Sequence, residues 1–427
     1  MSRVAVIGTG YVGLTTSACL AHLGHTVVGA DIDQAKIETL NRGQAPIYEE
    51  GLQELVLEGV EAGRLSFVSD SALAVESAEF VFLCVQTPQS EDGSADLTYL
   101  EQAAHQIGPV LEAGTVIINK STVPVGSTHV VERAIGRSDV PVVSNPEFIR
   151  EGSAVHDWLH PDRIIIGSDD QDVAIRVAGL FEPINSPVIV TDPASAEMIK
   201  YASNAFLATK ISFVNAMANL CQVLGADVRD VVLGMGYDKR IGFDFLTPGP
   251  GWGGSCLPKD TRALVRLGED AGYDFSLLRG VIEVNDEQFS QITDKIRRLA
   301  GGDLGGTTIA VWGLTFKAGT DDLRNSPSLA IVRRLLAAGA HVQAYDPTVG
   351  RSLTGELAEV EVCAEPYAAC EGASVLAVLT EWDEFRWLDF SKVLATMARP
   401  AIVDGRNLLD PEPLRQRGFA YEGVGRR

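Results

Sequence analysis

The segment from Val4 to Asp31 most restricts what this chain can fold into. Val4-Ala5-Val6-Ile7 is an apolar run typical of a strand buried on both faces, and Gly8-Thr9-Gly10-Tyr11-Val12-Gly13 follows it directly. A helical pattern comes next, and then a second apolar run that ends in Asp31. The glycines permit a tight turn and a close approach to a pyrophosphate, and the helix N-terminus supplies N–H groups. This order of elements predicts a dinucleotide-binding unit.

Asp31 indicates which dinucleotide to expect. A carboxylate at the end of the second strand accepts hydrogen bonds from a ribose diol and repels a 2′-phosphate. The sequence therefore favours NAD over NADP. The alternative is an ordinary structural turn between a strand and a helix, without a ligand.

Composition narrows the class of protein further. A length of 427 residues suggests two or three domains, and 46% apolar residues suffice for sizeable cores. The net charge of −22 argues against nucleic acid or an anionic membrane as a partner. The six cysteines show no spacing typical of disulfides or of a metal site, and no apolar run is long enough to span a bilayer. Together with the absence of a signal-peptide pattern, this predicts a cytoplasmic protein.

Further apolar runs are followed by polar turns at their C-terminal ends, where ligands of open α/β sheets bind. Lys120-Ser121-Thr122 follows one run and Asn145-Pro146-Glu147 follows the next. Thr122 and Glu147 are thus expected near a nicotinamide, although Thr122 could equally be a helix N-cap. Glu151 is expected about one helical turn beyond Glu147.

Residues 193–224 are predicted to form one long helix. Asp192 before Pro193 is a favourable start, and Gly225 suits the C-terminal stop. At helical spacing one inward-facing stripe carries Lys200, Asn204, Leu207 and Ile211. We interpret Lys200 and Asn204 as a functional pair, the alternative being a solvated helix face. Such a helix would also be a natural spine and dimer contact.

A cysteine loop follows at Gly251-Trp252-Gly253-Gly254-Ser255-Cys256, with Lys259 and Asp260 after it. We interpret the run as a flexible loop, a candidate nucleophile and the start of a helix. A cysteine attacks as the thiolate, which cations and helix N-termini favour. The alternative is a buried, inert cysteine beside a turn.

The first pattern recurs weakly near residue 308. Thr308 to Gly313 matches the first strand and its glycine, and Ala340 to Asp346 matches the second strand and its acid. Thr315 stands where the second glycine would be, which makes a dinucleotide improbable here. Cations at the predicted strand ends are placed for a different phosphate ligand, the alternative for each being a solvated surface charge: Lys317, Arg324 and Arg406.

Taken together, these pieces resemble the nucleotide-sugar dehydrogenases over nearly the whole chain. The matching motifs are Gly8–Gly13, Ile47–Leu52, Lys120–Pro124, Asn145–Phe148, Lys200–Asn204, the cysteine loop, Phe316–Lys317 and Asp404–Arg406. The resemblance implies an α/β fold with two Rossmann-like doubly wound domains joined by a long central helix. The expected domains are residues 1–192 for NAD, 193–300 for the central helix and the cysteine loop, and 301–427 for a UDP-sugar.

The resemblance also implies site residues. The cofactor would contact Gly8, Gly10, Tyr11, Val12, Gly13, Asp31, Lys36, Thr87, Thr122, Glu151, Lys259 and Arg324. The sugar nucleotide would contact Glu147, Phe148, Lys200, Asn204, Arg240, Phe245, Thr247, Gly253, Phe316, Lys317 and Arg406. Catalysis would involve Cys256, Lys200, Asn204, Asp260, Glu147 and Thr122, with no metal. Some relatives carry a lysine in place of Thr247, so this chain lacks the lysine that makes one phosphate contact in those relatives.

The implied activity is oxidation of a sugar C6 alcohol to a carboxylate with two NAD+ consumed. UDP-glucose is the expected substrate, reacting through a thiohemiacetal and a thioester of Cys256. GDP-mannose or another nucleotide sugar is the first alternative. A two-electron hydroxyacid-type dehydrogenase and a non-catalytic nucleotide-binding protein are the others. The expected assembly is a homodimer through the central helix.

Overall fold

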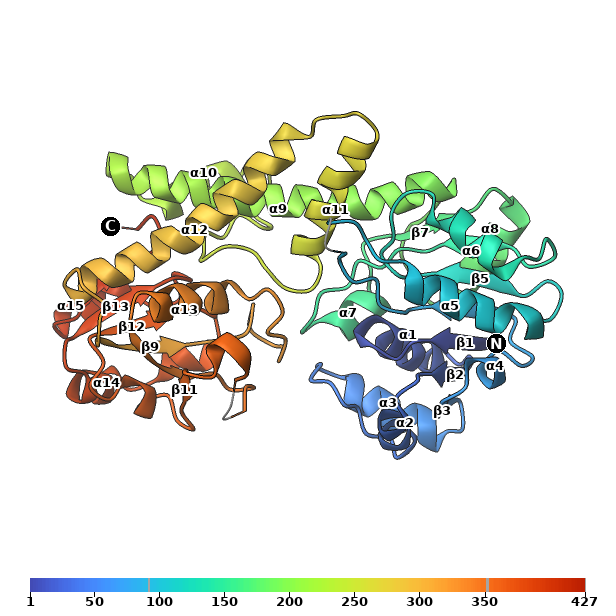
Figure 1. Cartoon of the computed structure of the whole chain (residues 1–427), viewed down its shortest axis with the longest axis horizontal. Helices are drawn as coiled ribbons and strands as arrows, with labels where there is room; N and C mark the ends of the chain where they lie inside the picture. Colours follow the sequence, from blue (N-terminus) through green and yellow to red (C-terminus); the bar gives the residue numbers. More distant parts are fainter. Residues whose placement is uncertain (91–92, 351–352, 427) are drawn as a thin grey trace. The chain divides into compact units, whose positions relative to one another are not determined.

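The computed structural model describes residues 1–90, 93–350 and 353–426. The chain forms two compact units (Figure 1), Met1–Ser203 with Arg262–Ala271, and Asn204–Thr261 with Gly272–Arg427. Each unit contains a parallel or mostly parallel sheet between helices. The predicted fold class, two Rossmann-like α/β parts and a long central helix, is confirmed.

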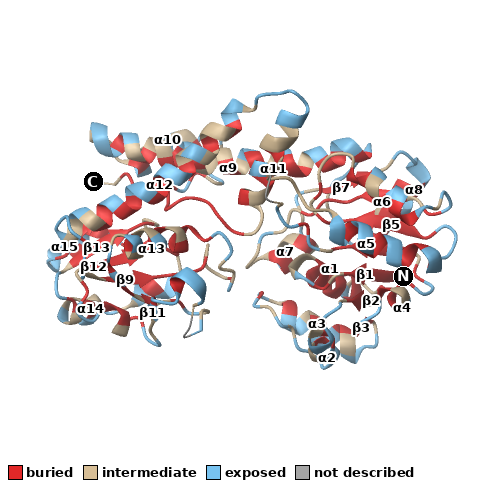
Figure 2. Cartoon of the chain, in the orientation of Figure 1, coloured by how far each residue is buried: buried red, intermediate tan, exposed pale blue. Residues whose placement is uncertain are grey.

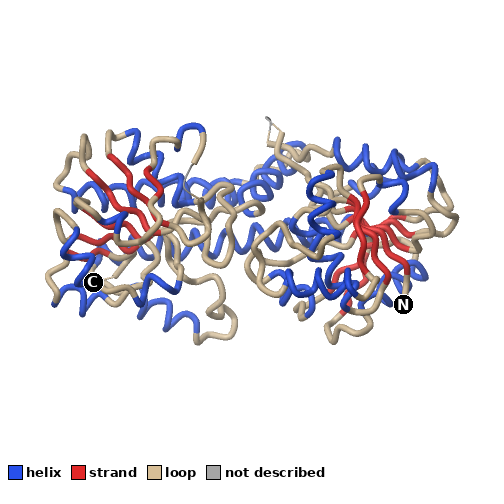
Figure 3. Tube along the Cα trace, turned by 90° about the horizontal axis from the view of Figure 1, so that it is seen from below, coloured by secondary structure: helices blue, strands red, loops and turns tan. Residues whose placement is uncertain are grey.

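The first unit is built on an eight-stranded sheet with the order β3-β2-β1-β4-β5-β6-β7-β8. All neighbouring strands pair in parallel except β6 and β7, which are antiparallel and joined through the single residue pair Ser144 and Gly167. Figure 3 shows these strands as red segments. Their bounds are β1 Arg3–Ile7, β2 Thr26–Ala30, β3 Leu65–Val68, β4 Phe80–Leu83, β5 Val116–Asn119, β6 Val142–Ser144, β7 Ile164–Gly167 and β8 Val188–Thr191.

Helices cover both faces of this sheet because successive side chains of its strands point to opposite sides. In β1, Val4 and Val6 belong to one apolar core, and Ala5 and Ile7 belong to the other. Figure 2 shows the central strands as buried. The helices are α1 Tyr11–His22, α2 Gln34–Asn41, α3 Leu52–Glu61, α4 Ser71–Ala74, α5 Thr98–Ile107, α6 Ser127–Ile135, α7 Ala154–Leu159 and α8 Gln171–Ala178.

The predicted long helix is confirmed as α9, Pro193–Leu224. The Asp192 carboxylate accepts the Ser195 N–H at 2.9 Å, and Gly225 has a φ of 73° at the other end. Lys200 and Asn204 are 4% and 7% exposed. Leu207 and Ile211 are half-buried, so the predicted stripe is less deeply buried in its second half. The buried row continues instead through Ala208, Ser212 and Asn215, because 3.6 residues per turn carry it around the helix.

The second unit is built on a six-stranded parallel sheet with the order β11-β10-β9-β12-β13-β14. The predicted recurrence of the first pattern is confirmed in β9 Thr308–Trp312 and β10 His341–Tyr345. The other strands are β11 Glu361–Val362, β12 Val375–Val378, β13 Ala401–Asp404 and β14 Ala420–Glu422. As in the first sheet, two apolar cores lie on opposite faces.

The remaining α-helices are α10 Val228–Gly236, α11 Leu257–Asp270, α12 Ser276–Ala300, α13 Pro327–Ala337, α14 Phe390–Thr396 and α15 Pro411–Gln416. Short 3-10 helices lie at Gly108–Val110, Gly179–Phe181, Gly355–Leu357, Ala368–Cys370 and Asp383–Trp387. Of the helices in the described ranges, none has the length and apolar character needed to cross a membrane.

Candidate active site

The three glycines after β1 have different geometric tasks. Gly8 has a φ of 93°, a conformation that side chains with a Cβ rarely adopt. A Cβ on Gly13 would lie 1.8 Å from the Gly8 carbonyl oxygen, so the close packing of α1 against the turn requires a glycine. A Cβ on Gly10 would meet nothing within 4 Å, so the turn has open space at the start of α1. This geometry fits a pyrophosphate held at the helix N-terminus.

Asp31 lies at the end of β2, beside this turn. Its carboxylate accepts hydrogen bonds from the Thr9 hydroxyl at 2.7 Å, the Thr9 N–H at 3.0 Å and the Lys36 ammonium at 2.8 Å. Partial burial acts to raise the pKa of Asp31, but the hydrogen bonds from Lys36 and Thr9 outweigh it and hold that pKa below its usual value. The side chain keeps 15% exposure, so an ionised carboxylate remains partly accessible to solvent.

The predicted residues at the ends of β4 and β5 are joined by a hydrogen bond. The Thr87 hydroxyl donates to the Thr122 carbonyl oxygen at 2.8 Å. The alternative role of Thr122 as a helix N-cap is wrong, since α6 begins at Ser127 and its N-cap is Gly126. The side chain of Thr122 is half-buried in the loop between β5 and α6.

Glu147 and Lys200 form a buried ion pair in the first unit. The Lys200 ammonium donates to a Glu147 carboxylate oxygen at 2.7 Å, with the two side chains 5% and 4% exposed. The other oxygen accepts the Ile149 N–H at 2.9 Å. Burial acts to raise the pKa of Glu147, but Lys200 outweighs it and the pKa lies below its usual value. A buried carboxylate of this kind is held ionised and aimed by its partner.

Two cations lie near the aromatic ring of Phe148. The Arg163 guanidinium is 3.8 Å from its ring centroid, and the Lys200 ammonium is 5.4 Å from it. The expectation that Glu151 lies one helical turn beyond Glu147 is wrong, because residues 145–153 form a loop and α7 begins at Ala154. Gly152, the residue after Glu151, donates its N–H to the Tyr11 hydroxyl at 2.8 Å, which ties this loop to the glycine turn.

The cysteine loop is packed and hydrogen-bonded in the second unit, and its flexibility stays a prediction. Residues 248–254 are buried, and side-chain amides of α9 and α12 hold their backbone. Asn215 accepts the Gly249 N–H at 2.8 Å, Gln288 donates to the Gly249 carbonyl at 2.7 Å, and Asn285 exchanges two hydrogen bonds with the Trp252 backbone. A Cβ on Gly253 would lie 2.1 Å from the Asn325 carbonyl oxygen. Gly253 therefore permits close packing that a side chain would prevent.

Cys256 stands directly before α11, and Asp260 lies in the first turn of that helix. The Asp260 N–H donates to the Cys256 carbonyl at 2.9 Å. The Asp260 carboxylate is 1% exposed and accepts from the Asn204 amide at 2.6 Å and from the Lys259 ammonium at 2.5 Å. The second unit thus brings together Asn204, Cys256 and Asp260.

The accessibility of Cys256 argues against the interpretation of a buried, inert thiol. It is half-buried, with the Ser255 hydroxyl 3.5 Å from its sulfur. Cys84, by contrast, is buried, and burial raises the pKa of its thiol to about 12. A helix N-terminus, such as that of α11, favours the thiolate form that a nucleophile needs.

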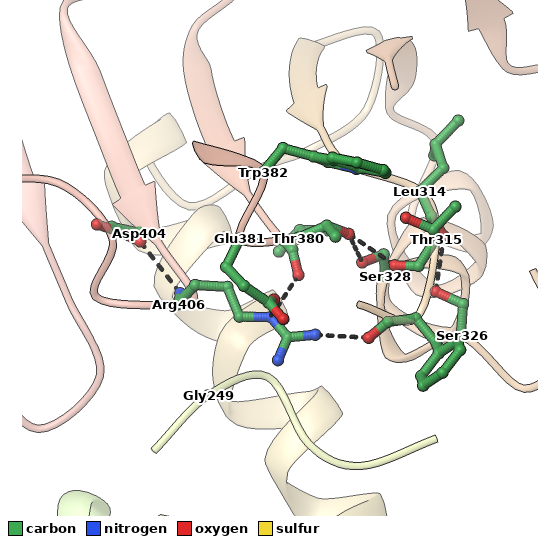
Figure 4. Close-up of polar contacts among 12 residues, drawn as sticks. Gly249, Leu314, Thr315, Ser326, Ser328, Thr380, Glu381, Trp382, Asp404 and Arg406 are labelled. Atoms are coloured by element: carbon green, nitrogen blue, oxygen red, sulfur yellow. Dashed lines mark hydrogen bonds and ion pairs between the residues drawn. The ribbon is translucent and has the colours of Figure 1, made fainter. Parts of the chain in front are cut away.

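A second polar group lies at the ends of β12 and β13 (Figure 4). The Arg406 guanidinium donates to the Leu379 and Phe316 carbonyls at 2.9 and 2.8 Å and lies 2.9 Å from a Glu381 oxygen. Gly249 of the cysteine loop lies beside it, since a Cβ there would be 3.5 Å from an Arg406 nitrogen. Arg406 and Phe316 are thus brought together with the cysteine loop.

Other predicted cations lie on exposed segments beside an acid. Arg240 pairs with Asp238 at 2.5 Å and is 88% exposed, and Arg324 pairs with Asp322 at 2.6 Å and is 63% exposed. Thr247 is exposed, and Lys317 and Phe245 are half-buried. Contacts between these residues and a ligand stay a prediction.

Sequence reasoning assigned no role to several polar residues that the structure brings to the site. Lys120 is buried and donates to Asn145, and Glu49 accepts the N–H groups of Gly152 and Ala154 at 2.7 Å each. Both lie inside motifs of the family resemblance, which was the available signal. Among the residues that the structure describes, no cluster of three or more histidine, cysteine or acidic side chains could hold a metal ion.

The fold and these groups define the class of the protein. A glycine turn with its acid is a dinucleotide site, and the cysteine, the amide and the two buried acids are groups of an oxidoreductase, so the protein is an NAD-dependent oxidoreductase. Three models of the UDP-glucose/GDP-mannose dehydrogenase family match the chain: the NAD binding domain at residues 2–185, the central domain at 194–287 and the UDP binding domain at 310–411. The chain belongs to this family.

Individual relatives are similar over their full length. UDP-glucose 6-dehydrogenase TuaD of Bacillus subtilis is 46% identical over 100% of this chain and 94% of that protein. UDP-glucose 6-dehydrogenase of Rhizobium meliloti is 46% identical over 99% of both chains. The structure of a UDP-glucose dehydrogenase from the hyperthermophilic archaeon Pyrobaculum islandicum is 37% identical, covers 100% of this chain and 98% of that chain, and superposes with a TM-score of 0.91.

Proposed function

We propose that this protein oxidises UDP-glucose to UDP-glucuronate, consuming two NAD+ and one water. The observation that carries the proposal is the grouping of Asn204, Cys256 and Asp260, with Asp260 bonded to Asn204 one turn after the cysteine. A two-electron oxidation has no use for a nucleophilic cysteine, whereas a four-electron oxidation needs one to hold the aldehyde. The names of the similar relatives support UDP-glucose as the substrate.

The first step removes a hydride and a hydroxyl proton from C6 to give an aldehyde. NAD+ supplies the hydride acceptor, and the glycine turn and Asp31 would hold it. The sequence left two proton acceptors open, Lys200 and a water held by Asp260. The ion pair with Glu147 favours the ammonium form of Lys200, so the water on Asp260 is the better acceptor.

The second oxidation takes place on the enzyme. The Cys256 thiolate adds to the aldehyde carbon, and the resulting oxyanion is stabilised by the Lys200 ammonium and the Asn204 amide. Transfer of the second hydride from C6 to the second NAD+ consumed would turn this thiohemiacetal into a thioester. Water then adds to the thioester carbon and the thiolate leaves, which releases the carboxylate. Glu147, Thr122 and Asp260 position and activate that water.

The second unit is the proposed site of the UDP group. Arg406 and Lys317 are the cations for the diphosphate, with Phe316 beside them. GDP-mannose is the first alternative substrate, because the family includes both activities by name. The cysteine loop in its Gly-Ser-Cys form, with Arg240-Ile241-Gly242 before it, favours UDP-glucose within the resemblance on which this assignment rests.

The experiment is a panel of nucleotide sugars scored by NADH absorbance, run with the wild-type protein and with Cys256→Ser. We expect UDP-glucose to give the highest kcat/KM, and the serine variant to bind both ligands with turnover nearly abolished. Wild-type turnover in the serine variant would contradict the nucleophile. A higher kcat/KM for GDP-mannose would contradict the substrate alone.

A companion test addresses the oxyanion donors. We expect Asn204→Ala to lower kcat by about 10²–10³ with a small change in KM, and Lys200→Ala to cost more because a charge is lost as well. Measuring kcat beside thermal unfolding separates catalysis from packing. A lowered melting temperature with unchanged kcat would contradict the oxyanion role.

The proposal includes a homodimer through α9 and a cytoplasmic location. Phe206, Phe213 and Leu220 recur every seven residues on α9 and are 65%, 46% and 47% exposed. A seven-residue apolar repeat suits the seam between two helices. We expect light scattering to give twice the mass of one chain, and the double variant Phe206→Asp, Phe213→Asp to give one. A monomeric wild-type protein would contradict the dimer.

A further inference from the structure

Lys120 is a buried ammonium to which the proposed reaction gives no role. It follows β5 directly, is 5% exposed, and donates its Nζ hydrogen to the Asn145 side-chain oxygen at 3.0 Å. Burying an ammonium costs several kcal/mol unless close partners compensate. A lysine kept at such a position calls for an explanation beyond packing.

The hydrogen bond of Lys120 continues across the sheet. Asn145 donates its amide hydrogen to the Ile165 carbonyl of β7 at 2.7 Å. Here β7 runs antiparallel to β6, and the two strands are paired through the single residue pair Ser144 and Gly167. The chain of contacts from Lys120 through Asn145 to Ile165 therefore links three strands at a point where the sheet has few hydrogen bonds of its own.

Glu147 lies two residues after Asn145, and its carboxylate accepts a hydrogen bond from the Lys200 ammonium. Its buried carboxylate lies in the field of two buried ammonium groups, Lys200 and Lys120. The other titratable groups that act on Lys120 are the thiols Cys84 after β4 and Cys19 of α1, whose pKa values burial raises. Burial lowers the pKa of Lys120, while Glu147 and the two thiols act against that shift. In its ammonium form Lys120 is a second cation that acts on Glu147, supplied from a different strand.

We propose that Lys120 is a positioning residue for the oxidation: through Asn145 it fixes the strand end that carries Glu147. Its charge is a second influence on that carboxylate. The inference rests on the proposed function, because that function assigns Glu147 the role of positioning and activating a water molecule. Lys120 acts through Asn145 and Glu147 and is not itself assigned a contact with the substrate.

The test compares three substitutions at Lys120 in the full-length protein by the pH profile of kcat. Lys120→Met removes both charge and hydrogen bond, Lys120→Gln removes the charge and keeps a donor, and Lys120→Arg keeps the charge. Removing a nearby cation raises the pKa of Glu147, so the ionised form is lost at a higher pH. We expect the acid limb of kcat to move to higher pH in Lys120→Met and Lys120→Gln, and to stay in Lys120→Arg.

The size of kcat and a matched control complete the test. We expect kcat of Lys120→Met at its optimum to fall roughly 10-fold to 100-fold while KM changes little, because the carboxylate is displaced. Lys295→Met is the control: Lys295 is likewise buried, at 3% exposure, and bonded to Gln222, but it belongs to the second unit. It should lower the melting temperature and leave the acid limb in place.

An acid limb that stays in Lys120→Gln, with kcat unchanged, would overturn the proposal. That variant keeps a donor for Asn145, which makes it the informative one if Lys120→Met does not fold. Glu147→Gln separates this failure from failure of the proposed function. If Glu147→Gln keeps its rate, the role of Glu147 is wrong; if it loses its rate while Lys120 variants behave like wild type, the Lys120 role alone is wrong.

Discussion

The two units contain the same corner, a glycine turn after the first strand facing an acid after the second, and use it differently. In the first unit Gly8 donates its N–H to the Ala30 carbonyl and Asp31 follows β2. In the second unit Gly313 donates to the Tyr345 carbonyl, and the acid after β10 is Asp346. The backbone geometry is alike, with φ of 93° at Gly8 and 94° at Gly313.

The acids differ in what surrounds them. Asp31 keeps 15% side-chain exposure and its partners are Thr9, Lys36 and the Asp33 N–H. Asp346 is 4% exposed. Its oxygens accept from the backbone of Leu314, from backbone and hydroxyl of Thr315 and Thr348, and from the Trp382 indole at 3.2 Å. Its hydrogen-bonding capacity is taken up inside the protein.

The difference teaches that one corner can serve either a ligand or the fold. In the first unit α1 begins at Tyr11, so the helix N-terminus faces the turn. In the second unit α13 begins at Pro327, and the intervening residues carry Phe316 and Lys317. In the second unit the acid after β10 is hydrogen-bonded by the protein itself. The groups proposed to bind a ligand lie instead on the segment before α13 and at Arg406.

The largest expected effect is on stability, in the second unit. Asp346→Ala leaves several buried donors without an acceptor, each costing about 1–3 kcal/mol. We expect unfolding free energy to fall by about 3 kcal/mol or more, with the ratio of kcat/KM for NAD and NADP unchanged. Calorimetry beside cofactor kinetics measures both. A change in cofactor preference would show that the second acid also serves the dinucleotide.

Next in size is the effect of Asp31→Ala on cofactor choice. Loss of the carboxylate removes hydrogen bonds to the ribose diol and the repulsion of a 2′-phosphate. The wild-type preference for NAD should be at least about tenfold, roughly 1.4 kcal/mol, and the variant should lose most of it. Equal efficiency with NAD and NADP in the wild type would mean that Asp31 is not at the ribose.

A smaller effect is expected from Lys36→Met, and it depends on pH. The Lys36 hydrogen bond lowers the pKa of Asp31, so its removal raises that pKa. The ionised carboxylate is then lost at a higher pH on acidification. The rise in KM for NAD at low pH should therefore begin at a higher pH than in the wild type, with a few-fold effect or less near neutrality. Identical pH profiles of KM for NAD in the variant and the wild type would show that Lys36 does not set the ionisation of Asp31.

The smallest effect is expected from Thr315→Gly, which restores the missing glycine of the second turn. Thr315 contributes one hydroxyl hydrogen bond to Asp346, worth about 1 kcal/mol. Because the Trp382 indole and backbone N–H groups would still donate hydrogen bonds to the Asp346 carboxylate, the variant should gain no second NAD site. Equilibrium binding of NAD by calorimetry measures this. A second bound NAD per chain would show that the glycine alone decides the ligand.

Much of the architecture follows from local sequence pattern, while the closed parts of the site depend on distant contacts. Apolar runs followed by polar turns predict strands and their ligand edge, and helical spacing with Asp192 and Gly225 predicts α9. The backbone of the cysteine loop is hydrogen-bonded to Asn215, Asn285 and Gln288, amides inside two helices that carry no local signal. The hydrogen bond from the Trp382 indole to Asp346 and the antiparallel pairing of β6 with β7 likewise join residues that are distant in the sequence.

Charged side chains show the same limit. Lys200 and Asn204 were predicted to face inward, and both are buried. Their bonds to Glu147 and Asp260 join residues more than fifty positions apart, which spacing on one helix does not reveal. Lys120 is a polar residue in a turn by its sequence, and its burial depends on neighbouring strands.

The central claim is that one active site carries out both oxidations through Cys256. The direct measurement is the number of NADH formed per UDP-glucose consumed, with the sugar limiting and the reaction run to completion. We expect two NADH per sugar and UDP-glucuronate as the product. One NADH per sugar with a released aldehyde would contradict the account.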